Sequence, residues 1–561
     1  MRHASLLALC SLALFGATSC VHDRAPVAPP ASPSAWTRAS DEILDGLLRA
    51  DPSWGRQLGL HQFDGKVADV SQKALDAQLA EIDDDLARIS KIDPSTLSPD
   101  EALDREILSR VLRKERFERV DLDAPHKVPQ FYESLFGVDV YVERAYAPLA
   151  DRCAKLVEHE RAALDQVAHV KENLAPPLSK TVASVASKNF AGYAEYLRGD
   201  VAKACQGAGD DAFRKSFADA NEALAKSADA LSTWLKDEMI PKGDDAQHVL
   251  GEARFRKLLE VQEGLTISID DFARMGEDDL AKNAKAYDAI APTTTPTRPA
   301  PQELLSAATH IKDDARAFVA QKKIASIPSG DDAQVKESPP FQRWNAAFLD
   351  ASGPFDAYQA AFFYVTLPDP TWPAKKQFEY VPTRGVLAST TVHEVWPGHF
   401  LQKLHQDLAP TRIEKMSWSY SFGEGWAHYA EQMMIEEGFE GATPEMRLGQ
   451  LADALLRDCR FVVSVGVHVR GMTLAQAAKR FVDDCKQDAA TAEQQAERAT
   501  FDPGYFAYTL GKLEILALRQ EAKDKLGAKF SLQAFHDALL AHGAPPVALI
   551  RERVLRDLGA M

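Results

Sequence analysis

The chain has 561 residues, of which 45% are hydrophobic and 26% are charged, as is ordinary for a globular protein. A chain of this length can bury a large core and divide into one to three domains. Its formal net charge is -17, and its Lys and Arg residues form no cluster. Binding to a phosphate backbone needs concentrated positive charge, so we expect no nucleic-acid partner.

Residues 1–19 have the layout of an export signal. Two polar residues at the N-terminus precede an apolar run from Leu6 to Phe15, which is too short to span a bilayer. Small residues then lead to Cys20, although Ala17 stands where a bacterial lipoprotein signal more usually has leucine. We interpret the segment as a lipoprotein signal that leaves Cys20 as the lipidated first residue. The alternative is ordinary signal cleavage at residues 17–19.

The residues after Cys20 bear on where the protein resides. Val21, rather than Asp, favours sorting to the outer membrane of the cell envelope. Residues 20–37 are rich in Pro and Ala, which predicts an extended tether. We therefore expect an exported lipoprotein whose contact with the membrane is only an N-terminal lipid anchor. Its oligomeric state is not predicted.

Four cysteines remain beyond the signal: Cys153, Cys205, Cys459 and Cys485. An even number in an oxidising compartment permits two disulfides, with three possible connectivities. Pairing cysteines that are close in sequence joins Cys153 to Cys205 and Cys459 to Cys485, and four free thiols are the alternative. No cysteine spacing indicates a cysteine-based metal site.

Helical patterns dominate the region 38–290. Ser98-Pro99-Asp100-Glu101 is a capping box with proline at the first helical position. Long amphipathic patterns cover residues 71–92, 141–172, 180–206, 211–237 and 251–288. None of them carries recognisable chemistry. We predict an N-terminal helical region that forms the walls of a cleft.

Residues 291–301 are rich in Pro and Thr and predict a loop, which separates this region from a catalytic region, 302–561. A helix is expected over 302–322. The apolar run Ala361–Thr366 is the best strand candidate, and its backbone edge is predicted to pair with a peptide. Helical periodicity returns after residue 384. The expected fold is mainly α, a large metallopeptidase-like body with a deep cleft and a small β element near the active site.

A His-Glu motif in the second region points to metal chemistry. In the familiar zinc-peptidase motif His-Glu-x-x-His, the histidines share one face of a helix and the glutamate polarises water. Here His393 and His399 are six positions apart, about 600° around a regular helix, so they would point in different directions. Pro397 and Gly398 lie between them and can break the helix. We therefore predict a distortion that brings His399 back toward His393.

Two histidines and a water leave one position of a tetrahedral zinc site to fill. Glu424, flanked by Gly423 and Gly425, is the natural third ligand, at the start of a second helix. Glu431 lies two helical turns further on and is predicted to orient one of the histidines from behind. His428 is a competing ligand of lower rank, and His405 is interpreted as a surface residue.

Together these segments resemble the bacterial domain-of-unknown-function 885 (DUF885) family. The likeness rests on His-Glu-x-x-Pro-Gly-His at 393–399 and Gly-Glu-Gly-Trp-Ala-x-Tyr-x-Glu at 423–431. It extends to Gly59–Asp64, Gly466–His468 and Pro503–Tyr505, and so covers most of the mature chain. The family is generally grouped with gluzincin-type zinc metallopeptidases.

The resemblance implies one Zn²⁺ ion bound by His393, His399 and Glu424, with Glu394 as the general base that passes a proton from water to the leaving amine. A donor for the oxyanion is expected from a later helix. Tyr508 is the first choice for this donor, and the alternatives are Tyr505 and His468. A packed aromatic or a structural histidine is the other interpretation of each.

Two arginines, Arg460 and Arg519, lie in apolar helices of this region. Each is expected either to be paired structurally or to hold a substrate carboxylate. We therefore expect a zinc metallopeptidase that hydrolyses short peptides. The alternatives are a zinc hydrolase of non-peptide amides or esters and a non-catalytic envelope lipoprotein that keeps the fold.

Overall fold

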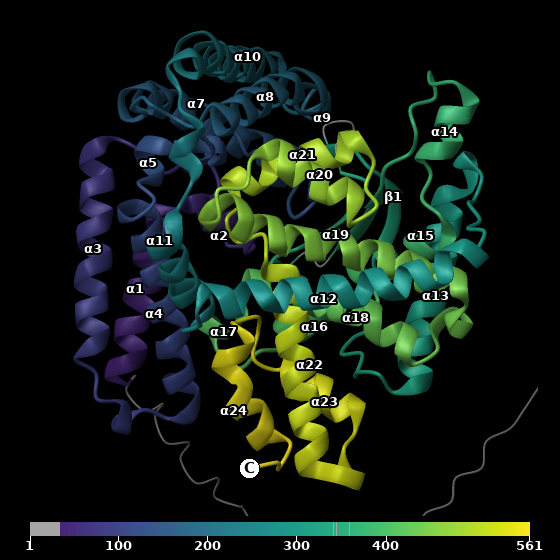
Figure 1. The fold of residues 1–561 in the computed structure, drawn as a ribbon. Coiled ribbons are helices and arrows are strands. Elements are labelled where there is room, and N and C mark those ends of the chain that lie inside the picture. Colours follow the sequence, from purple (N-terminus) through teal and green to yellow (C-terminus); the bar gives the residue numbers. More distant parts are fainter. Residues whose placement is uncertain (1–33, 340–341, 344, 358–359) are drawn as a thin grey trace, which may run out of the picture.

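The computed structural model describes residues 34–339, 342–343, 345–357 and 360–561. Helices make up most of these residues, so the expectation of a mainly α fold is confirmed (Figure 1). The signal, Cys20 and most of the predicted tether lie outside the described residues. Residues 35–37, predicted as part of the tether, belong instead to a helix that begins at Ala35 and is capped by the Ser34 side chain. No described helix is long and apolar enough to cross a membrane.

The first four helices belong to the main core of the molecule: α1 (Ala35–Ala50), α2 (Pro52–Gln57), α3 (Gln72–Ser90) and α4 (Pro99–Val120). The predicted capping box at Ser98 is present at the start of α4. Apolar side chains of α1 and α4, such as Ile43 and Leu112, share a core with Trp396 and Trp426 from the motif segments. The boundary predicted near residue 290 therefore does not separate two cores.

A second core lies within the N-terminal region, in a layer at the top of Figure 1. Its principal helices are α7 (Leu149–Asn173), α8 (Lys180–Tyr196) and α10 (Asp211–Trp234), with the shorter α5 (Ala124–Lys127), α6 (Asp139–Glu143) and α9 (Ala202–Ala204) beside them. The single helix expected over 141–172 is wrong, because Pro148 precedes a new helix start. A disulfide joins Cys153 to Cys205, as predicted.

The helix expected over 251–288 is also divided in two, α11 (Gly251–Leu258) and α12 (Ile269–Ile290). Gly264 lies between them with φ of 73°, a left-handed conformation that glycine adopts without strain. The predicted loop at 291–301 is confirmed apart from short 3₁₀ turns, and α13 (Leu304–Lys322) follows it.

The β element is a three-stranded sheet of β1 (Gln334–Glu337), β2 (Ala347–Ala351) and β3 (Ala361–Val365), in the order β1-β3-β2. The predicted strand is present as β3. Its proposed free edge is wrong, since β3 is central and pairs with β1 in parallel and with β2 in antiparallel orientation. The strand with an edge on the motif side is β2.

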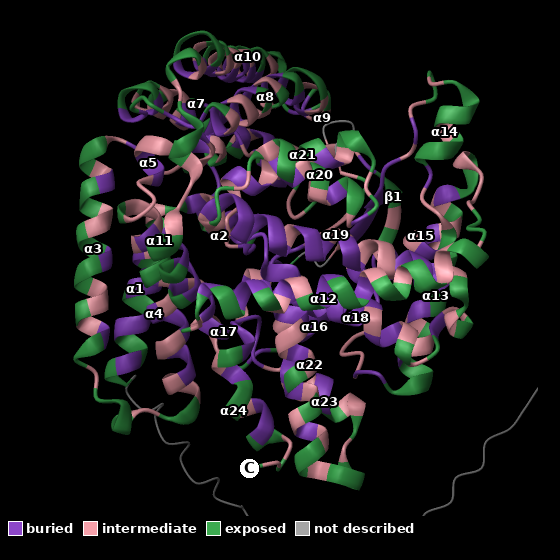
Figure 2. Cartoon of the chain, viewed as in Figure 1, coloured by how far each residue is buried: buried purple, intermediate pink, exposed green. Residues whose placement is uncertain are grey.

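The C-terminal region supplies the helices around the motif: α14 (Ala374–Tyr380), α15 (Arg384–Glu394), α16 (His399–Gln406), α17 (Arg412–Met416), α18 (Tyr420–Glu436) and α19 (Pro444–Val469). The chain ends with α20 (Leu474–Asp483), α21 (Ala489–Phe501), α22 (Ala507–Leu526), α23 (Leu532–Leu540) and α24 (Val547–Asp557). A second disulfide, Cys459–Cys485, ties α19 to the segment after α20, again as predicted. Figure 2 shows that α18 and α19 are largely buried in the middle of the body.

Candidate metal centre

The helix that carries the first histidine ends between the two motif histidines. α15 stops at Glu394, and α16 begins at His399. In the break, the Gly398 N–H donates to the carbonyl of Val392 over 3.0 Å. A Cβ atom at Gly398 would lie 1.8 Å from the carbonyl oxygen of His393, so only glycine allows this close approach. The predicted distortion is confirmed.

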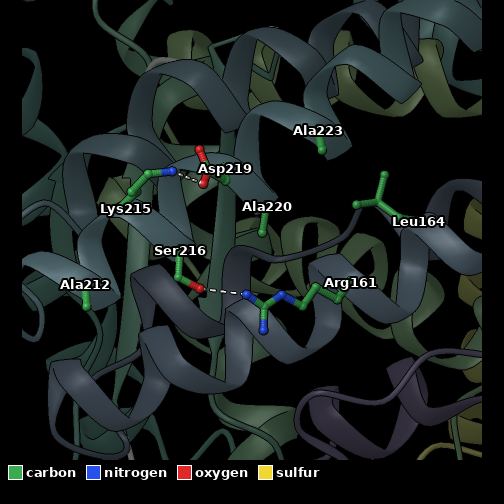
Figure 3. Close-up of a pocket in the computed structure, with 8 residues that line it drawn as sticks. All are labelled: Arg161, Leu164, Ala212, Lys215, Ser216, Asp219, Ala220 and Ala223. Atoms are coloured by element: carbon green, nitrogen blue, oxygen red, sulfur yellow. Dashed lines mark hydrogen bonds and ion pairs between the residues drawn. The ribbon is translucent and has the colours of Figure 1, made fainter.

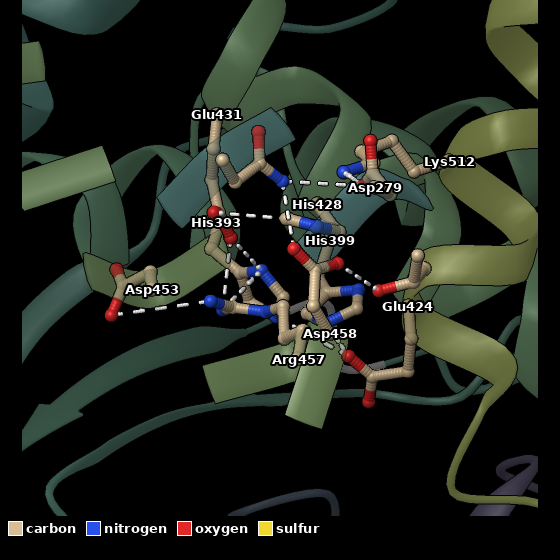
Figure 4. A network of polar contacts seen from close by, with 12 residues as sticks. Asp279, His393, His399, Glu424, His428, Glu431, Asp453, Arg457, Asp458 and Lys512 are labelled. Atoms are coloured by element: carbon tan, nitrogen blue, oxygen red, sulfur yellow. Dashed lines mark hydrogen bonds and ion pairs between the residues drawn. The ribbon is translucent and has the colours of Figure 1, made fainter. Parts of the chain in front are cut away.

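The break brings the two imidazoles together. Their ring centroids are 4.8 Å apart and the rings are nearly perpendicular. The Nε2 atom of His393 lies 3.3 Å from Oε2 of Glu424, and Nε2 of His399 lies 3.5 Å from the same oxygen. Figure 4 shows the three side chains converging from α15, α16 and α18. The structure therefore gathers the three residues that the sequence suggested as ligands.

Glu424 reaches this point because α18 packs closely against its neighbours. It lies in the second turn of α18, which the Ser419 side chain caps, and not at the helix start. A Cβ atom at Gly425 would lie 2.4 Å from the Cα atom of Gly511 in α22, and one at Gly423 would lie 2.4 Å from the Trp418 ring. The flanking glycines thus serve close approach, as the sequence suggested.

The three donor atoms lie within 4.8 Å of one another, and two of their separations suit a zinc ion. Ligands about 2.1 Å from a tetrahedral zinc lie about 3.4 Å from one another. The two separations between imidazole nitrogen and carboxylate oxygen, 3.3 and 3.5 Å, match this value. Oε2 of Glu424 is buried and has no hydrogen-bond partner among the described residues. Two imidazoles and a carboxylate are also the donor set of known catalytic zinc sites.

Behind the ligands, Glu431 organises a buried polar network (Figure 4). Its carboxylate lies 2.7 Å from Nδ1 of His393, as predicted, 2.8 Å from the guanidinium of Arg457 and 3.2 Å from Nδ1 of His428. Burial raises the pKa of Glu431, but the charges of Arg457 and His428 outweigh burial and hold this pKa well below its ordinary value. An ionised Glu431 orients the His393 ring so that Nε2 faces the other ligands. His428 lies behind the ligands.

Glu394 lies beside the ligands at the end of α15. One of its oxygens accepts a hydrogen bond of 2.9 Å from the backbone N–H of Leu349 in β2. Burial raises the pKa of Glu394, and the charges of His393 and His399 oppose that rise. A carboxylate with a raised pKa, held next to the ligands, has the properties of a general base.

Tyr508 lies next to the centre, on α22. Its ring is 5.5 Å from that of Tyr420, and burial together with the charge of Glu424 raises its pKa, so the phenol keeps its proton. Tyr505 lies in the turn that precedes α22, and its hydroxyl donates to Gln495. The Tyr505 hydroxyl is therefore engaged by Gln495, whereas Tyr508 contacts Tyr420 and responds to the charge of Glu424.

Three other residues singled out from the sequence lie away from the ligands. The ring nitrogens of His468 face the carbonyls of His248 and Ala499, at 3.0 and 2.7 Å, so it is a structural histidine. Arg519 binds Glu436 and the hydroxyl of Tyr429, at 2.8 and 3.1 Å, and is therefore paired structurally. His405 is buried, not at the surface, and lies 2.9 Å from the carbonyl of Ser326.

Sequence reasoning missed three contributors to the centre. Arg457 binds Glu431, and a cation within the apolar part of helix α19 was a signal for such a buried partner. The Leu349 N–H contact to Glu394 depends on tertiary structure and left no sequence signal. Trp418 is 58% exposed and its ring lies 6.3 Å from that of His399, so it offers an apolar surface beside the ligands.

A separate surface groove lies away from the ligands. A groove of about 570 Å³ is lined by residues of α7 and α10, among them Arg161, Ser216 and Asp219 (Figure 3). Its polar side chains contact one another, as in the 2.6 Å hydrogen bond from Arg161 to Ser216. The deep cleft expected at the motif stays a prediction, although side chains of His399 and Glu424 are 16% and 18% exposed.

The fold and the ligand geometry define a mainly α-helical protein with a candidate metal centre. The family described as "Bacterial protein of unknown function (DUF885)" matches residues 52–554, and the chain belongs to that family. No curated protein matches it in sequence.

Two solved structures share the fold. A candidate lipoprotein of unknown function from Shewanella oneidensis is 22% identical, with a TM-score of 0.76, and the match covers 93% of this chain and 100% of that one. A candidate lipoprotein from Colwellia psychrerythraea is 18% identical, with a TM-score of 0.75, and the match covers 94% of this chain and 100% of that one.

Proposed function

We propose that this protein is a zinc-dependent metallopeptidase that hydrolyses short peptides. The observation that carries the proposal is the convergence of His393, His399 and Glu424 beside Glu394. A structural metal site has no need of an adjacent carboxylate with a raised pKa. Zinc bound by these three ligands would act as a Lewis acid and lower the pKa of water.

The chain's own residues supply the rest of the chemistry. Glu394 takes a proton from the attacking water and delivers it to the leaving amine, and the Leu349 N–H fixes its orientation through one carboxylate oxygen. Tyr508, which keeps its proton, donates a hydrogen bond to the developing oxyanion. Glu431 and Arg457 hold the His393 ring in place throughout.

The edge of β2 suits a peptide backbone. Thr366 N–H donates to Ala346 and Ser352 N–H donates to Ala360, so even-numbered positions of this strand bond to β3. The odd-numbered Leu349 instead points its N–H outward to Glu394. An extended peptide added to this outer edge would carry a peptide bond past Glu394. Trp418 would contact an apolar side chain of that peptide.

Export to the cell envelope is part of the proposal. The signal-like residues 1–19 and Cys20 support it, as do two relatives of the same fold that are described as candidate lipoproteins. Two disulfides are also typical of an oxidising compartment. We propose a lipid anchor at Cys20 and a position on the outer membrane.

The test combines metal analysis with hydrolysis of a mixed peptide library by wild type and by Glu394→Gln. The proposal predicts about one zinc per chain in both proteins, and turnover about 10²- to 10⁴-fold lower in the variant. Zinc with equal, negligible turnover in both would favour the non-catalytic lipoprotein. Turnover of amide or ester model compounds but of no peptide would favour the non-peptide hydrolase.

A further inference from the structure

Two arginines one helical turn apart on α19 have different surroundings. Arg457 is buried and its charge is balanced, since its guanidinium lies 2.8 Å from Glu431 and 3.9 Å from Asp453. Arg460 is only partly buried. Its Nε donates to the amide oxygen of Gln495 over 3.0 Å, which is a neutral partner. The two residues therefore have different roles.

The remaining neighbours of Arg460 are aromatic. Its guanidinium lies 4.9 Å from the ring centre of Tyr505 and 4.8 Å from that of Tyr508. Within the part of the chain that the structure describes, no carboxylate lies at ion-pair distance from it. The charge of Arg460 acts on the nearby Asp502, but Asp502 is bound directly by Arg498 at 3.2 Å. Arg460 is therefore a cation with no direct carboxylate partner among the described residues, in a chain whose net charge is -17.

Arg460 also lies next to the proposed chemistry. The Tyr508 ring contacts Arg460 on one side, and Tyr508 is close enough to Glu424 for that charge to help raise its pKa. Arg457, one turn away on the same face, reaches Nδ1 of His393 at 3.2 Å. An arginine stacked on aromatic rings keeps its planar fork in a fixed orientation, which suits two-pronged binding of a carboxylate.

We infer that Arg460 binds a carboxylate of the substrate and thereby directs cleavage to a bond near that carboxylate. The inference rests on the proposed peptidase function and names its substrate class: peptides with a free C-terminal carboxylate, cut close to the C-terminus. An acidic side chain in the same part of the peptide presents the same chemistry. A partly buried cation without a protein carboxylate becomes paired when such a substrate binds.

The test compares matched peptides that end in a free acid or in an amide, with Gln or Glu near the C-terminus. Wild type is expected to prefer the acid through a lower KM, by about 10- to 100-fold in kcat/KM. Arg460→Gln is expected to lose this preference chiefly by raising KM for the acid, with zinc content unchanged. Arg470→Gln, at the exposed end of the same helix, is the control and should behave as wild type.

A binding measurement keeps the inference separate from the proposed function. In the Glu394→Gln background, calorimetry with the acid and amide peptides should show tighter binding of the acid, and the difference should vanish when Arg460→Gln is added. If Arg460→Gln removes the preference for peptides with Glu over Gln, and not the preference for a free acid over an amide, the bound carboxylate is a side chain. The inference would be overturned if acid and amide peptides bind equally and Glu and Gln peptides also bind equally. It would also be overturned if a preference for the carboxylate persists in Arg460→Gln. Absence of zinc and of turnover would contradict the proposed peptidase function but not the carboxylate binding by Arg460.

Discussion

Two glutamates of this molecule, Glu160 and Glu424, each keep a buried carboxylate oxygen without a hydrogen-bond partner, but in opposite electrostatic settings. Glu160, in α7, is fully buried and both of its oxygens lack partners. Burial raises its pKa to about 9, so it is a neutral acid at pH 7. Burial also raises the pKa of Glu424, but His393 and His399 outweigh burial and hold it well below its ordinary value.

The difference shows what distinguishes a site from an isolated buried polar group. A lone carboxyl group in an apolar core loses its charge and needs nothing further. Glu424 stays ionised, because two imidazoles share one of its oxygens at distances that suit ligands of one ion. Convergence of donors on one carboxylate oxygen therefore carries more information about function than burial or a surface hollow does.

The largest expected effect concerns the oxyanion donor. Tyr508→Phe removes the hydroxyl and keeps the ring between Arg460 and Tyr420. We expect kcat on a peptide substrate to fall by about 10²- to 10³-fold, because the lost hydrogen bond is one that forms only in the transition state. Steady-state kinetics with metal analysis checks this result. Tyr505→Phe is the control, and equal loss in both variants would contradict the assignment.

Glu431→Gln tests whether the network behind the ligands supports the metal. The variant keeps the shape of the side chain but removes the charge that faces His393 and Arg457. We expect zinc affinity to fall by about 10- to 100-fold, as for other outer partners of metal ligands. Competition with a fluorescent chelator measures the affinity. Unchanged affinity would mean that Glu431 serves the fold alone.

How far the sequence predicts this centre depends on the kind of contact. The pair Pro397-Gly398 predicts the helix break, and the spacing of Glu424 and Glu431 predicts that both face the histidines. These are local relations, set by helix geometry. The Leu349 contact and the exposed Trp418 depend on how the sheet and the loop before α18 pack, which no local pattern encodes.

The fold follows the same division. Helical periodicity predicts the helices, but the breaks at Pro148 and Gly264 interrupt two of them where long patterns appear continuous. The assignment of β3 as an edge strand fails because its two partners are short and weakly patterned. The grouping of α1–α4 with the C-terminal core is a long-range property, which periodicity does not report.

Glu160→Gln tests the other glutamate of the comparison, through the pH dependence of stability. The folded-state pKa is raised to about 9 from 4.5, so the folded protein holds a proton that the unfolded chain releases. The contribution of Glu160 to stability is therefore present below pH 4.5 and is lost as pH rises toward 9. We expect the variant to match wild type near pH 4.5 and to be more stable at pH 8, by on the order of 1–3 kcal/mol.

Thermal unfolding of both proteins across this pH range measures the effect. The difference between the two melting temperatures should grow with pH, while zinc content stays the same. A constant difference would show that Glu160 is not a neutral acid in the folded protein.

The smallest effect is expected at the groove of α7 and α10. Arg161→Ala removes a hydrogen bond to Ser216 that lies at the surface. We expect a change in stability below about 0.5 kcal/mol, with peptide turnover and zinc content unchanged. A substantial loss of turnover would show that the groove takes part in function, and that the metal centre is not the whole site.

The most direct test of the central claim is the zinc content of two proteins that carry the same substitution, Glu424→Gln and Glu160→Gln. Each is purified at neutral pH, confirmed to be folded by circular dichroism and measured for metal against wild type. The account predicts about one zinc per chain in wild type and in Glu160→Gln, and a large loss in folded Glu424→Gln. Equal zinc in both variants, or none in wild type after reconstitution, would contradict it.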